Sequence, residues 1–242
     1  MKTYILMGTH LAEIRHCIRA LARVVPAPGK VQVHVPEGLE WSIGDTDAYT
    51  MVTYDPESVL WVLDPDSEDT CFIIIDPRAP LIGQIEHLAG DLAKCLVEPI
   101  KIVTCVDSER TEKSTALRAW LDACIYYSDV VLLGNRQNAS KPFLREYQKH
   151  YERLCYPCLF LFLKGEGQPN DPIEILTPGI RRISQLFDIE TGDGEEPLPG
   201  MVIESSCDLY LEEEENDPFR SPDDEQGASH VPDPSGFIVP AS

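Results

Sequence analysis

The feature that most constrains the fold is an uninterrupted apolar run at residues 71–75, which is followed by Asp76 and Pro77. Three of its five residues are β-branched, so the run predicts a strand that is buried on both faces. Such strands occur in parallel sheets that are covered by helices on each side. Asp76 marks the carboxyl end of this strand, the edge at which open α/β sheets bind ligands.

Apolar runs and helical patterns alternate along the chain as far as about residue 165. Strands are predicted near 3–7, 31–35, 49–54, 58–63, 71–76, 100–106, 129–134 and 159–163. Helices are predicted near 11–25, 82–96, 110–126 and 140–154, with a weaker one at 180–187. The alternation predicts right-handed βαβ units and therefore a three-layer α/β/α domain with a mostly parallel sheet.

Charge divides the chain into a domain at residues 1–187 and a tail at 188–242. The formal charge is −21, and 16 of the 41 acidic residues but one of the 20 basic residues lie in the tail, which is also rich in Pro and Gly. We expect this acidic tail to be largely disordered. An acidic surface argues against nucleic acid and membrane as main partners, so we expect a protein partner, with the tail as a candidate contact.

The chain has the composition of a cytoplasmic protein. Residues 1–7 form a short apolar segment without the features of a signal peptide, and no apolar run approaches the length of a membrane span. Most of the eight cysteines fall within predicted strands and helices, which favours reduced, buried thiols over a disulfide framework.

The order of these segments resembles the nucleotide-binding domain of the CobW/HypB/UreG family of P-loop GTPases. The resemblance covers roughly residues 1–165 and depends on the turn at Gly8 and on residues 35–45, 73–80, 103–107 and 128–138. It implies a P-loop-NTPase-like fold, binding of GTP and Mg²⁺, and in many members a Cys-x-Cys-Cys metal motif. It also implies a vestigial nucleotide site at Gly8, Asp76, Asn135 and Asn138.

The phosphate-binding loop departs from that family. Such a loop needs a Lys that reaches the phosphates and a hydroxyl that holds Mg²⁺. Counted from Gly8, these last positions hold Glu13, Ile14 and Arg15, so an acidic residue lies where the phosphates would bind. We therefore favour the interpretation that Gly8 starts a tight strand-to-helix turn with Thr9 as N-cap.

The other nucleotide positions are also altered. Asp76 could hold a metal or water, or could cap the turn; the Gly expected three positions later is Ala79. Asn138 replaces the Asp whose two oxygens accept hydrogen bonds from guanine in the family. An Asn side chain has only one acceptor oxygen, so one buried donor of guanine would be left without a partner, at a cost of about 1–3 kcal/mol in binding. The alternative is that this loop only caps the next helix, through Asn138 or Ser140.

Cys155 and Cys158 form the only Cys-x-x-Cys pair, and no thiol occupies the place of the family's metal motif, near residues 58–61. A zinc site needs four ligands, so we favour packing ahead of a buried strand, with metal binding as the alternative.

Together these patterns predict a non-catalytic binding or regulatory module derived from a CobW-type GTPase with an eroded nucleotide site and no cofactor. The alternative is a GTP-binding, metallochaperone-like protein that uses GTP and Mg²⁺, and also Zn²⁺ at relocated ligands.

Overall fold

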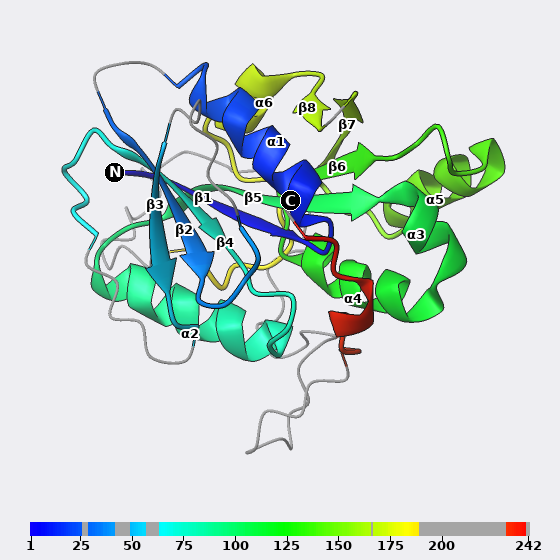
Figure 1. The fold of residues 1–242 in the computed structure, drawn as a ribbon, viewed down its shortest axis with the longest axis horizontal. Helices are drawn as coiled ribbons and strands as arrows, with labels where there is room; N and C mark the ends of the chain where they lie inside the picture. The colour runs from blue at the N-terminus through cyan, green and yellow to red at the C-terminus, as the bar shows by residue number, and fades with distance from the viewer. Residues whose placement is uncertain (26–28, 42–48, 57–62, 166, 189–230, 241–242) are drawn as a thin grey trace, which may run out of the picture.

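A computed structural model describes residues 1–25, 29–41, 49–56, 63–165, 167–188 and 231–240 (Figure 1). The strands are β1 (Lys2–Gly8), β2 (Val31–Pro36), β3 (Thr50–Tyr54), β4 (Thr70–Ile74), β5 (Pro99–Asp107), β6 (Val130–Gly134), β7 (Leu159–Lys164) and β8 (Gln168–Pro169). The helices are α1 (Leu11–Ala22), α2 (Leu81–Lys94), α3 (Ser108–Lys113), α4 (Thr115–Tyr126), α5 (Lys141–Arg153), α6 (Pro172–Leu176) and the 3₁₀ turn η2 (Ser235–Phe237).

The strands form one sheet in the order β3-β2-β4-β1-β5-β6-β7-β8. Every neighbouring pair is parallel except β7 and β8, which are antiparallel. The predicted three-layer fold with a mostly parallel sheet is therefore confirmed. The first strand of the chain lies near the middle of the sheet, between β4 and β5.

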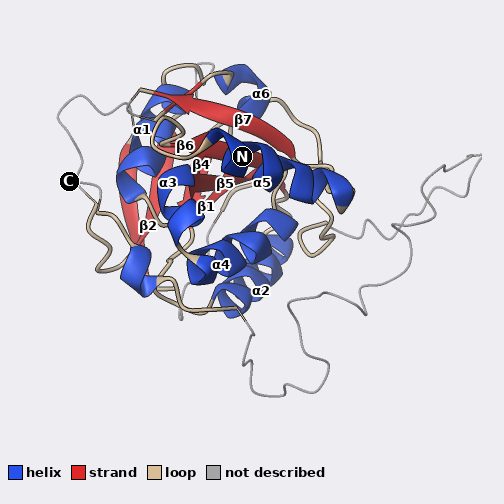
Figure 2. Ribbon diagram, turned by 90° about the vertical axis from the view of Figure 1, so that its right-hand side faces the viewer, coloured by secondary structure: helices blue, strands red, loops and turns tan. Residues whose placement is uncertain are grey.

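Helices cover both faces of the sheet (Figures 1 and 2). Because successive side chains of a strand point to opposite faces, β1 contributes side chains to the apolar layers on both faces of the sheet. Ile5 and Met7 pack with α2, α4 and α5, whereas Tyr4 and Leu6 pack with α1 and α6. The core is thus two apolar layers that share a central strand.

The helix predicted at 110–126 is interrupted at Ser114, whose extended backbone ends α3 and begins α4. The Ser114 hydroxyl accepts a hydrogen bond from the amide of Leu117 at 3.1 Å, which satisfies a free donor of the second helix. One serine therefore produces two short helices where the apolar pattern suggested one.

The helix predicted at 180–187 is wrong, because this segment is irregular. Its anchor is the fully buried side chain of Arg182, which forms an ion pair of 3.3 Å with the equally buried Asp129 and another with Asp188. Asp129 also accepts hydrogen bonds from the amides of Ile102 and Arg181, at 2.7 and 2.6 Å. This polar anchor holds the segment against the sheet without helical turns.

Two predictions fall mainly outside the described residues. The strand predicted at 58–63 includes 58–62, and the disorder predicted for the tail concerns 189–230 in particular. Residues 231–240 of that tail are described, and they lie against the carboxyl end of β1 and the start of α1 (Figure 1). No helix in the described ranges has the length and apolar character needed to cross a membrane.

Candidate functional site

The turn between β1 and α1 begins at Gly8, which has a φ of +149°. A Cβ added at this position would lie 2.6 Å from the carbonyl oxygen of Cys105, so the close approach of β1 to β5 requires glycine. The N-cap of α1 is His10, whose Nδ1 accepts a hydrogen bond from the amide of Glu13 at 3.1 Å. The prediction of Thr9 as N-cap is therefore wrong by one residue.

The Glu13 carboxyl group is buried in the first turn of α1, with 7% of the residue exposed. It lies against Gly134, where an added Cβ would be 2.4 and 2.5 Å from the two carboxyl oxygens. Oε2 of Glu13 has no hydrogen-bond partner. Burial, reinforced by the charge of Asp107, raises the pKa of Glu13 from 4.5 to about 7, although a hydrogen bond from the backbone of Asn135 opposes the shift. This side chain is therefore partly protonated at neutral pH.

Asp107 lies at the carboxyl end of β5 and joins three elements. Its Oδ1 accepts the amide of Arg110 at 3.1 Å, and its Oδ2 accepts the side-chain amide of Asn135 at 3.1 Å. The Arg110 guanidinium is 3.7 Å from the same carboxylate. Desolvation lowers the pKa of His10, against the opposing effect of Asp107. The ends of β1, β5 and β6 thus enclose a polar cluster, which we call the edge cluster: His10, Glu13, Asp107, Arg110 and Asn135.

Sequence reasoning named Asn135 but gave no role to Asp107 or Arg110. The sequence position of Asp107 could have identified it as a candidate site residue, because Asp107 follows a buried apolar run in the same way as Asp76. The side-chain amide of Asn135 is directed to Asp107, and its backbone has a φ of +48°.

Ile14 and Arg15 occupy the positions at which a phosphate loop has its Lys and hydroxyl residues. Ile14 is fully buried in the apolar layer between α1 and the sheet, and Arg15 is 7% exposed.

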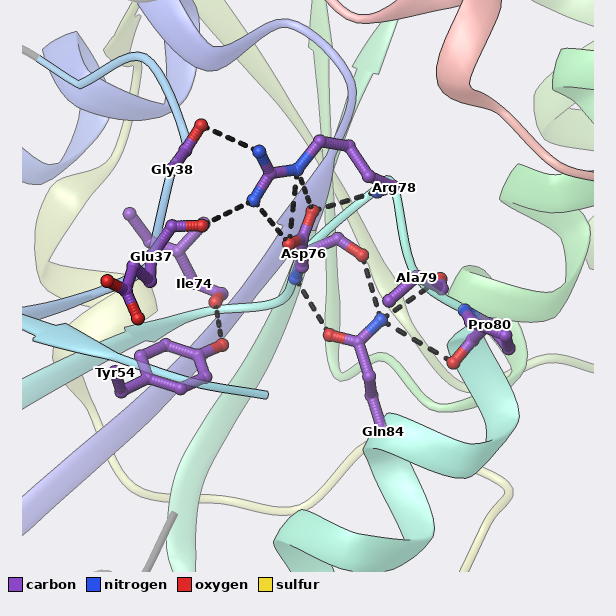
Figure 3. A network of polar contacts seen from close by, with 9 residues as sticks. All are labelled: Glu37, Gly38, Tyr54, Ile74, Asp76, Arg78, Ala79, Pro80 and Gln84. Atoms are coloured by element: carbon purple, nitrogen blue, oxygen red, sulfur yellow. Dashed lines mark hydrogen bonds and ion pairs between the residues drawn. The ribbon is translucent and has the colours of Figure 1, made fainter. Parts of the chain in front are cut away.

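Asp76 is buried at the end of the β4 segment, and Figure 3 shows how it is held. Both of its carboxylate oxygens accept hydrogen bonds from Arg78, at 2.9 Å from Nε to Oδ1 and 2.7 Å from Nη2 to Oδ2. Its Oδ1 also accepts the Arg78 amide at 2.9 Å, which is the turn cap that the sequence allowed. A cation at this carboxylate would have to compete with the guanidinium.

The Asp76 network also connects three segments (Figure 3). The Arg78 guanidinium donates to the carbonyl groups of Glu37 and Gly38 at 2.7 and 2.6 Å, in the loop after β2. Gln84 of α2 accepts the amide of Asp76 at 3.0 Å and donates to its carbonyl group at 2.8 Å. These contacts give Asp76 a structural role, because they hold the end of the β4 segment, the loop after β2 and the start of α2 together.

Asn138 is exposed in the turn after β6, where its amide donates to the carbonyl of Asn135 at 3.1 Å and its side chain bonds Glu109. Ser140 caps α5 by accepting the amide of Phe143 at 3.3 Å, as the capping alternative predicted. The loop therefore forms the turn after β6 and caps the start of α5.

Cys155 and Cys158 differ in environment. Cys158 is buried, and burial raises the pKa of its thiol to about 12. Cys155 is exposed with a φ of +57°, in the position after the C-cap of α5, where the amide of Tyr156 bonds the carbonyl of Tyr151. The prediction of a packed thiol is confirmed for Cys158 and wrong for Cys155.

No disulfide and no group of three or more His, Cys, Asp or Glu side chains placed to hold a metal ion occurs within the described ranges. Cys207 lies outside those ranges.

Comparison with known proteins gives one structural similarity. The chain is similar to the Zn(II)-bound YjiA GTPase from E. coli, with a TM-score of 0.42 and 15% sequence identity. The match covers 74% of this chain and 61% of that chain, so this chain spans about three fifths of the length of its structural neighbour. No family model and no curated protein sequence matches the chain.

Proposed function

We propose that the protein is a non-catalytic binding module, built on a scaffold of the P-loop-NTPase type, whose nucleotide site has been replaced by the edge cluster. The proposal follows the sequence resemblance to CobW-type GTPases and the departures from it at Glu13, Ile14 and Arg15.

The observation that carries the proposal is the placement of Glu13. A phosphate site directs backbone N–H groups, a Lys and Mg²⁺ at several negative charges. Here the first turn of α1 contains a buried carboxyl group packed on Gly134 and beside the acidic Asp107. Raising the pKa of Glu13 is the response of a carboxyl group to burial and nearby negative charge, and a phosphate group at this place would meet the same repulsion.

Base recognition and metal binding are weakened as well. Asn135 bonds Asp107, and Asn138 is engaged with Glu109. Both oxygens of Asp76 are bonded by Arg78. The side chains at three positions that the family would use for nucleotide or Mg²⁺ therefore each have an intramolecular partner: Asp76, Asn135 and Asn138.

Isothermal titration of the full chain with Mg-GTP tests the proposal, with a working P-loop GTPase as positive control and Mg²⁺ alone as blank. We expect a dissociation constant no better than about 1 mM, equivalent to about −4 kcal/mol. Micromolar, Mg²⁺-dependent binding, or GTP turnover that Asp76→Ala abolishes, would contradict the proposal.

A further inference from the structure

Residues 231–240, which we call the clip, pair with the turn between β1 and α1 through their backbone. The amide of Val239 donates to the carbonyl of Thr9 at 2.7 Å, and the carbonyl of Val239 accepts the amide of Leu11 at 2.8 Å. These two bonds form a short parallel bridge opposite His10. The Leu11 amide is one of the donors that an α-helix leaves unsatisfied at its start, so the clip supplies an acceptor that α1 lacks.

The clip is also bonded to the edge cluster. Arg110 donates from Nη1 to the carbonyl of Phe237 at 2.7 Å while its Nε lies 3.7 Å from Asp107. The guanidinium therefore links the clip to the carboxylate at the end of β5. This contact recognises a backbone carbonyl and is independent of the clip's side chains.

Apolar side chains of the clip contact both layers of the core. Val231 and Phe237 pack against the layer formed with α2 and α4, whereas Ile238 packs against the layer formed with α1. Pro234 is buried, and the Asp233 carboxylate accepts the amide of Ser235 at 2.8 Å, which fixes the turn before η2. The clip thus crosses the carboxyl edge of the sheet, as the red segment in Figure 1 shows.

This mode of contact has the form of peptide recognition. Backbone pairing to an exposed edge gives affinity, and apolar side chains in flanking contacts give selectivity. The Arg110 contact adds a side-chain donor that is directed at the backbone of the clip.

We propose that the carboxyl edge of the sheet is a peptide-binding site whose resident ligand is the chain's own clip. A partner protein is recognised by supplying an extended segment of the same kind, which pairs with Thr9 and Leu11, offers a carbonyl to Arg110 and places apolar side chains on both layers. The clip is tethered to the domain, so it competes at an effective concentration on the order of millimolar and sets the affinity that a partner must exceed. This inference rests on the proposed function, because a nucleotide at the same edge would exclude the clip.

The test uses the full chain and a fluorescent peptide of residues 231–242. Val239→Pro in the chain deletes the amide that Thr9 accepts and should release the clip. The preceding Ile238 already has a ψ of 129°, which a following proline tolerates. The matched control is Val239→Ala, which keeps the amide.

We expect the wild-type chain and Val239→Ala to bind the peptide weakly and Val239→Pro to bind it at least about tenfold more tightly. Hydrogen exchange of the Leu11 amide should accelerate in Val239→Pro and slow again when the peptide is added. Arg110→Gln in the Val239→Pro background should reduce peptide affinity, and circular dichroism checks that each variant is folded.

The proposal is overturned if folded Val239→Pro does not bind the peptide, if it binds no better than the wild type, or if a scrambled peptide binds equally well. Peptide binding by Val239→Ala that equals that of Val239→Pro would overturn the role of backbone pairing. A chain that binds neither peptide nor Mg-GTP refutes this inference alone, whereas tight binding of Mg-GTP refutes the proposed function.

Discussion

Replacing Glu13 with Gln tests the edge cluster directly, because the change removes an ionisable group and nearly preserves its shape. The pKa of this carboxyl is raised from 4.5 to about 7 by burial and by Asp107. Between those pH values the folded chain binds more protons at Glu13 than the unfolded chain does. The stabilisation is therefore complete below about pH 4.5 and is lost as the pH rises through 7.

The size of the effect follows from the shift. One pKa unit corresponds to about 1.4 kcal/mol, so the full contribution of Glu13 is about 3 kcal/mol, of which about 2.5 kcal/mol is lost between pH 5 and pH 8. Glu13→Gln does not titrate. A fixed cost of placing an amide beside Gly134 applies at both pH values and cancels in the comparison. The neighbouring charged residues are retained in both proteins, so their own contributions to stability cancel to first order.

Urea unfolding of wild type and Glu13→Gln at pH 5 and pH 8, at one ionic strength, measures this contribution. We expect the free energy of unfolding of the variant, relative to wild type, to rise by about 2.5 kcal/mol between pH 5 and pH 8. Glu40→Gln, at an exposed carboxyl, serves as the control and should show no such change. A variant-to-wild-type difference that is equal at the two pH values would refute the assignment of a protonated Glu13.

Three further changes test the surrounding structure. Gly134→Ala should destabilise the fold by about 1–3 kcal/mol through a clash with Glu13, and thermal unfolding should show a smaller loss in a Glu13→Ala background. Arg182→Met should lower the free energy of unfolding, measured in urea, by about 3–5 kcal/mol, because it leaves the buried Asp129 carboxylate without its ion pair. A variant as stable as the wild type would mean that the backbone amides of Ile102 and Arg181 are enough to stabilise this carboxylate. Cys155→Gly should raise the free energy of unfolding by about 1 kcal/mol by relieving a positive φ, whereas Cys155→Ala should leave it unchanged.

The elements that could be predicted from sequence are those that apolar periodicity encodes. The run at 71–75 gave β4 as a buried strand of a parallel sheet, and Ser140 gave the start of α5. Both depend on residues adjacent in the chain, so local reasoning was sufficient.

The remaining features depend on contacts between distant residues. Ser114 interrupts a helical pattern by capping in both directions, and the 180–187 segment is fixed by the pairing of Arg182 with Asp129, 53 positions earlier. The environment of Glu13 depends on Gly134, and the packing of the clip depends on Thr9 and Leu11. Composition classified the clip with the acidic tail because the tail as a whole is acidic and rich in Pro and Gly. The acceptors that the clip offers are backbone carbonyl groups, which any residue possesses, so composition gives no sign of them.

The central position of β1 has a consequence for how the chain folds. Lys2–Gly8 pairs with Thr70–Ile74 and with Pro99–Asp107, so neither of its hydrogen-bonded neighbours lies nearby in the chain. Non-local parallel pairing of this kind slows folding, because loop closure must precede the gain in contacts. Synthesis must reach Pro99–Asp107 before both edges of the apolar β1 strand can be paired. Until then at least one edge of β1 is unpaired, and an apolar strand with an unpaired edge is prone to aggregation.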